Sequence, residues 1–153
     1  KICNSSTIEI KAWNNLGLYS EIQNWNPSEV LIVDEVGILA DLYSWGQYAF
    51  VGGSMDRSVH SVMEPLAQGL LCFVGPEHEN NREALIFKDI QIGAMTPVQV
   101  ISDSDLMLRR FETLYQSWTS EHQMNLKLKV REKAGASEIV LKWIQNNVAF
   151  DSY

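Results

Sequence analysis

The stretch YAFVGGSMDRSVHSVMEPLAQGLLCFVG, residues 48–75, contains the pattern that decides the fold. Its two ends, 48–53 and 70–75, are apolar runs that finish on glycine, which is typical of buried strands followed by turns. Between them, residues 62–69 predict a helix with Gly69 just past its end. Short strands that are apolar on both faces and alternate with helices indicate a parallel sheet covered by helices on both sides.

The same alternation continues on both sides of this stretch. Further strands are predicted at 6–13, 29–37 and 97–102, and helices at 38–46, 80–89, 103–122, 122–134 and 136–148. The expected fold class is therefore α/β, a Rossmann-like parallel sheet with helices on both faces and a helical C-terminal tail from about residue 103. We expect residues 1–153 to form one such domain.

Composition narrows the possible partners. The chain has 153 residues, 46% of them hydrophobic, and a net charge of -7, so it can bury a core and has an acidic surface. Such a surface repels phosphate, which argues against non-specific binding to nucleic acid or anionic lipid. No apolar run reaches about 20 residues, so we expect neither a membrane-spanning segment nor a signal peptide. Of the two cysteines, Cys3 and Cys72, the second lies in an apolar run and is expected to be buried, and the lack of a disulfide framework indicates a cytoplasmic protein.

Three of the predicted strands end in a turn at a glycine. Gly37 ends the run at 29–37, Gly53 the run at 48–53, and Gly75 the run at 70–75. Ligands of open parallel sheets bind beyond the carboxyl ends of the strands, and glycine there permits positive φ or close approach of the backbone to a ligand. We therefore expect these turns to share one edge of the sheet and to form a binding site.

The residues before the helix at 62–69 have two interpretations each. Ser61 and Glu64 have the spacing of a capping box, worth about 1 kcal/mol, but the Glu64 carboxylate is equally suited to accept hydrogen bonds from the vicinal hydroxyls of a ribose. His60 is either a structural or exposed loop histidine or a donor to a phosphate oxygen. Ser54 and Ser61 either form turns or donate to the same phosphate.

Three short motifs carry a resemblance to a known family. They are Phe-Val-Gly-Gly-Ser at 50–54, His-Ser-Val-Met-Glu-Pro at 60–65, and Gly-Pro at 75–76 with Asn80 shortly after. With the helical tail, they make residues 30–145 similar to the C-terminal half of the bacterial 3-deoxy-D-manno-octulosonic acid (Kdo) transferases, which are GT-B glycosyltransferases. The Glu-Pro helix alone is shared with many GT-B enzymes, whereas the combination is more specific.

The resemblance implies that this half binds the donor CMP-Kdo, without metal or further cofactor. It also implies that a separate N-terminal half supplies the general base, the lipid A precursor acceptor and the membrane contact, at the cytoplasmic face of the bacterial inner membrane. The isolated chain is then expected to be inactive. The residues that would line the donor are Gly37, Gly53, Ser54, His60, Ser61, Glu64, Gly75, Pro76 and Asn80. Asp34, Glu35 and Asp41 lie near the first turn, where a solvated or capping role is expected.

The chain also departs from the family pattern, at Ile38, Val59 and Glu77 among other positions. Val59 replaces a glycine before the histidine, and Glu77 would repel a phosphate. These departures keep three alternatives open: a GT-B enzyme with a UDP or GDP donor, a degenerate nucleotide-binding or interaction domain, and a scaffold without a ligand.

Overall fold

The computed structural model describes residues 16–18, 30–55 and 59–147. The chain divides into two compact units, Lys1–Leu39 and Ala40–Tyr153. In the first unit, strands β1 (Leu16–Leu18) and β2 (Val30–Ile32) pair in parallel. β2 lies within the strand predicted at 29–37, β1 is an element that the sequence pattern does not predict, and the strand predicted at 6–13 lies outside the described residues.

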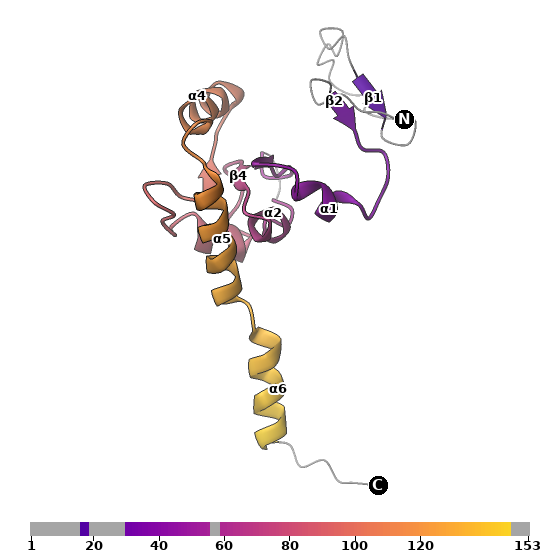
Figure 1. The fold of residues 1–153 in the computed structure, drawn as a ribbon, viewed down its shortest axis with the longest axis vertical. Helices are drawn as coiled ribbons and strands as arrows, with labels where there is room; N and C mark the ends of the chain where they lie inside the picture. The colour runs from indigo at the N-terminus through magenta and orange to yellow at the C-terminus, as the bar shows by residue number, and fades with distance from the viewer. Residues whose placement is uncertain (1–15, 19–29, 56–58, 148–153) are drawn as a thin grey trace. The chain divides into compact units, whose positions relative to one another are not determined.

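The second unit contains the stretch 48–75 (Figure 1). The elements that follow β2 along the chain are α1 (Leu39–Tyr43), β3 (Tyr48–Phe50), α2 (Met63–Ala67), β4 (Leu71–Val74), α3 (Arg82–Phe87), β5 (Val98–Val100), α4 (Ser104–Leu114), α5 (Ser120–Lys133) and α6 (Ala136–Asn147). The three strands form a sheet in the order β3-β4-β5, and both pairings are parallel. A helix connects each strand to the next, so the predicted alternation is confirmed.

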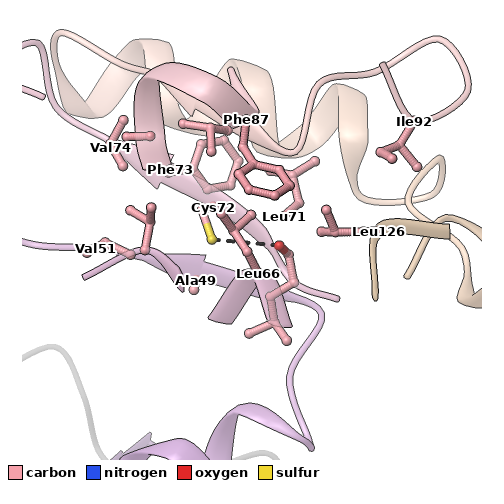
Figure 2. Packing of buried hydrophobic residues seen from close by; sticks show 14 of the residues in the cluster. Ala49, Val51, Leu66, Leu71, Cys72, Phe73, Val74, Phe87, Ile92 and Leu126 are labelled. Carbon is pink, nitrogen blue, oxygen red and sulfur yellow. Dashed lines mark hydrogen bonds between the residues drawn. The ribbon is translucent and has the colours of Figure 1, made fainter. Parts of the chain in front are cut away.

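The central strand β4 is buried on both of its faces. Leu71, Cys72, Phe73 and Val74 are each at most 1% exposed, although neighbouring side chains point to opposite sides of the sheet. α2 packs against β4 and against α5, and Figure 2 shows the apolar cluster around the strand. The expectation of helices on both faces is therefore confirmed.

Cys72 occupies this core as a small apolar residue, as predicted. Its thiol donates a weak hydrogen bond to the Leu70 carbonyl oxygen at 3.6 Å, which Figure 2 marks with a dashed line. Burial raises the pKa of the thiol far above its ordinary value, because a thiolate would be unsolvated there.

The helical tail is tied to the sheet by side-chain hydrogen bonds to main-chain carbonyls. The Tyr48 hydroxyl donates to the oxygens of Leu114 and Tyr115, at 3.1 and 2.9 Å, where α4 ends. The Trp118 indole N–H donates to the Gly69 oxygen at 3.1 Å, and Trp118 is only 2% exposed. The prediction of one helix over 103–122 is wrong, because the chain leaves the helix after Leu114 and inserts Trp118 into the core.

A substitution at Gly69 tests how closely α5 approaches the turn between α2 and β4. Gly69 has φ +82°, and a Cβ atom there would lie 2.7 Å from the Gln123 carbonyl oxygen of α5. Gly69→Ala should therefore lower the free energy of unfolding by about 3 kcal/mol, through a left-handed backbone and a main-chain collision.

Gly135→Ala is the matched control, since Gly135 has φ +105° but nothing within 4 Å of its would-be Cβ. Gly135→Ala should lower the free energy of unfolding by only about 1 kcal/mol, which is the cost of the left-handed backbone conformation alone. Urea denaturation followed by tryptophan fluorescence measures both variants, and equal losses would contradict the described contact between Gly69 and α5.

Candidate functional site

The loops that leave β3 and β4 begin at the same edge of the sheet. β3 and β4 are parallel neighbours, with Phe50 opposite Phe73. The turns at Gly53 and Gly75 therefore lie beyond the carboxyl ends of adjacent strands, as the sequence predicts. Gly53 has φ +94°, a left-handed conformation that favours glycine.

Ser54 connects these two loops. It is fully buried, and its side-chain oxygen accepts a hydrogen bond of 2.6 Å from the Gly75 main-chain N–H. The Ser54 carbonyl oxygen accepts a second bond, of 2.9 Å, from the N–H of Glu77. A Cβ atom at Gly75 would collide with that same carbonyl group, so the crossing requires glycine at position 75. Ser54 and Gly75 thus fix the loops against each other.

His60 makes a second connection through its main chain. Its N–H donates to the Gly52 oxygen at 3.2 Å, and its carbonyl accepts from the Asn81 side chain at 3.1 Å. The oxygen of the same Asn81 amide accepts from the N–H of Ala84 at 2.8 Å and caps α3. The backbone of His60 is therefore held in place, while its imidazole is exposed and has no hydrogen-bond partner among the described residues.

The predicted capping box of Ser61 and Glu64 is wrong. Val62 is the N-cap of α2, its φ and ψ of -94° and -10° are already helical, and no side chain caps this helix end. Ser61 therefore lies outside the capping position, and both Ser61 and Glu64 are exposed. The Glu64 carboxylate lies near enough to Tyr43 that, after burial, its charge is the second cause of the raised pKa of that phenol. Within the described part of the chain the Glu64 carboxylate has no hydrogen-bond partner, so a capping role no longer accounts for it.

The turn after β4 contains one residue that sequence reasoning did not select. Pro76 and Asn80 are exposed, whereas His78 between them is 7% exposed. The His78 Nδ1 atom lies 2.8 Å from the Pro76 oxygen and 3.1 Å from the Gly75 oxygen, and Nε2 is buried without a partner in the described part of the chain. Nothing in the spacing of polar residues signals this burial, because it depends on the path of the turn.

Gly37 belongs to the first unit. Its φ is +91°, which agrees with the predicted turn after β2. Its place beside Gly53 and Gly75, which belong to the second unit, stays a prediction. The nearby Asp34, Glu35 and Asp41 are all exposed.

A separate hollow of about 440 Å³ lies beside β5. It is lined by residues of the segment 88–96, of β5 and of α4, among them Lys88, Gln99 and Arg110. None of the predicted donor residues lines it, so its presence says nothing about the loops beyond β3 and β4.

The described part of the chain contains no helix with the length and apolar character that crossing a membrane requires. Nor do three or more histidine, cysteine or acidic side chains gather anywhere in it as a metal site would need.

The two serines of this region should respond differently to truncation. Ser54→Ala removes the buried acceptor of the Gly75 N–H and should lower the free energy of unfolding by about 1–3 kcal/mol. Ser61→Ala changes an exposed residue without a capping role and should stay within about 0.5 kcal/mol of the wild type. Chemical denaturation of both variants measures this, and a larger loss for Ser61→Ala would reinstate the capping box.

Comparison with known proteins identifies relatives of a large part of this chain. No protein-family model matches the chain. A 3-deoxy-D-manno-octulosonic acid transferase of Chlamydia muridarum is 34% identical over 109 residues, which are 69% of this chain and 24% of that protein. The protein of the same name from Chlamydia trachomatis serovar D is 40% identical over 68 residues, 43% of this chain and 16% of the relative.

A solved structure has the same fold. The C-terminal CMP-Kdo binding domain of WaaA from Acinetobacter baumannii superposes with a TM-score of 0.62 at 23% identity, covering 76% of this chain and 60% of that domain's chain. The chain thus spans about a quarter of the length of the Chlamydia muridarum relative and has the α/β architecture of the WaaA C-terminal domain. Over the matched residues, this chain is homologous to the 3-deoxy-D-manno-octulosonic acid transferases.

Proposed function

We propose that this chain is the donor-binding part of a Kdo transferase and that it binds CMP-Kdo. The observation that carries the proposal is the homology to proteins named 3-deoxy-D-manno-octulosonic acid transferase, at 34–40% identity. The fold of a domain that binds CMP-Kdo in WaaA supports it. Because the chain spans only about a quarter of that first relative, transfer of Kdo is proposed for the whole protein, and the isolated chain should be inactive.

The predicted donor residues then divide into two groups by burial. Ser54 and Gly75 are buried and hold the loops together, so they would act on the donor through the shape of the backbone. His60 and Glu64 are exposed and would contact the donor directly. In this arrangement the His60 imidazole donates to a phosphate oxygen of CMP, and the Glu64 carboxylate accepts from the two ribose hydroxyls. The residues that would border the donor are Gly37, Gly53, Ser61, Pro76 and Asn80.

The chemistry assigned to the whole protein is a displacement at the anomeric carbon of Kdo. The oxygen of an acceptor hydroxyl bonds to that carbon, the bond to the CMP phosphate oxygen breaks, and a general base takes the hydroxyl proton. The residues of this chain would stabilise the departing phosphate, whose negative charge grows as the bond breaks. No residue here is assigned as the general base, which we place in another part of the protein.

The remaining partners follow from the same proposal. The acceptor is a lipid A precursor held outside this chain, and the protein works at the cytoplasmic face of the bacterial inner membrane. The formal charge of -7 fits this division, because an acidic donor-binding part would not itself adhere to anionic lipid. The donor is a substrate, and the proposal requires no metal or further cofactor.

Nucleotide binding tests the proposal directly. In calorimetric titrations of the intact protein, CMP should bind more tightly than UMP or GMP. Preference for UMP or GMP would instead support a GT-B enzyme with a different donor. Binding of none of the three would favour a scaffold or interaction domain, as the departures at Ile38, Val59 and Glu77 allow.

Glu64→Gln tests the ribose contact. It replaces a charged acceptor with a neutral amide of the same shape, so CMP should bind about tenfold more weakly or worse. Because Glu64 is exposed and does not cap α2, the melting temperature should stay within about 2 °C of the wild type. Glu112→Gln, an exposed change on α4, is the control and should alter neither quantity. Unchanged CMP affinity in Glu64→Gln would exclude the ribose contact.

A further inference from the structure

His78 is a buried side chain that the predicted donor site does not use. It lies in the turn after β4, three residues beyond Gly75, and is 7% exposed. The preceding residue, Glu77, donates its main-chain N–H to the Ser54 carbonyl. The turn that carries His78 is therefore anchored to the same loop crossing that positions the predicted donor residues.

The contacts of one ring nitrogen determine the protonation of the other. Nδ1 lies 2.8 Å from the Pro76 oxygen and 3.1 Å from the Gly75 oxygen. Both partners are carbonyl groups, which only accept hydrogen bonds, so Nδ1 must carry a proton. In the neutral ring Nε2 is then unprotonated, and it can only accept.

Nε2 itself is buried and has no hydrogen-bond partner among the residues that the structure describes. Most buried polar atoms in folded proteins are paired, and an exception calls for an explanation. The partner that would satisfy Nε2 must bring a proton. A phosphate oxygen does not fit that requirement, whereas a sugar hydroxyl does.

We propose that Nε2 of His78 accepts a hydrogen bond from a hydroxyl group of the bound donor. The inference rests on the proposed function, because it takes the ligand at the loop crossing to be CMP-Kdo. The hydroxyl belongs either to the ribose or to the transferred sugar. Since Nε2 is buried in this structure, binding of the donor hydroxyl requires a local movement that exposes it.

Two substitutions separate this contact from the role of His78 in the turn. The amide nitrogen of asparagine takes the place of Nδ1, so His78→Asn keeps a donor toward Pro76 and Gly75 and removes Nε2. The longer glutamine places its amide near Nε2, so His78→Gln keeps an acceptor there and loses the contacts of Nδ1.

The experiment measures binding of cytidine, CMP and CMP-Kdo to the intact protein and its two variants. His78→Asn should keep the melting temperature within about 2 °C and weaken binding of CMP-Kdo about five- to tenfold. His78→Gln should have a lower melting temperature than His78→Asn but should bind CMP-Kdo more tightly than that variant does. If His78→Asn binds all three ligands more weakly than the wild type, the hydroxyl that bonds to Nε2 belongs to the ribose. If it binds only CMP-Kdo more weakly, the hydroxyl belongs to the transferred sugar.

Other outcomes overturn the inference. Wild-type affinity of His78→Asn for all three ligands would show that Nε2 has no ligand role. If His78→Asn binds CMP and CMP-Kdo more weakly but cytidine as tightly as the wild type does, His78 contacts the phosphate instead. Weaker binding by His78→Gln than by His78→Asn would mean that His78 acts only through the turn. Failure of the wild type to bind CMP or CMP-Kdo would overturn the proposed function together with this inference.

Discussion

The hydrogen bond from the Gly75 main chain to the Ser54 hydroxyl joins the fold of this protein to its candidate site. It forms where two loops cross beyond adjacent parallel strands, and it is fully buried. The crossing is possible because position 75 has no Cβ atom and because the Ser54 oxygen satisfies a main-chain N–H that would otherwise be buried and unpaired. The path of the turn that carries Glu77 and His78 depends on it, since the Glu77 N–H also bonds to Ser54.

The same crossing separates residues that support the site from residues that are available to a ligand. The buried Ser54 hydroxyl accepts a hydrogen bond from within the protein, whereas His60 has its main chain bonded on both sides and its imidazole exposed. Glu64 is likewise exposed, on a helix whose end it does not cap. In a loop, a polar residue that bonds to the protein's own main chain looks the same in the sequence as one that contacts a ligand. The two can be distinguished only when the path of the loop is known.

The elements of the second unit could be predicted from the sequence because their signals are local. The apolar run at 70–75 and Gly69 before it mark β4 and the end of α2, and both are found there. The break after α4 was not predictable, because Trp118 fits the apolar stripe of a longer helix equally well. Its burial against the Gly69 carbonyl is a contact between residues far apart in the sequence.

The candidate site was predictable to a similar extent. Parallel pairing of β3 and β4 brings Gly53 and Gly75 to one edge, as their positions after strands indicate. The capping box of Ser61 and Glu64 failed because Val62 already has helical dihedral angles, which spacing alone does not reveal. The burial of His78 depends on a turn whose shape is set by Ser54, more than twenty positions earlier in the chain, and therefore no local pattern contains it.

The bond from Trp118 to the Gly69 carbonyl has a consequence for the way the molecule opens. The turn between α2 and β4 and the start of α5 are in contact there, so neither can loosen without exposing a buried polar atom of the other. The amides of these two segments should therefore exchange with solvent deuterium through a shared opening event, although many residues of chain separate them. Helix α5 would then belong to the same cooperative folding unit as the central strand.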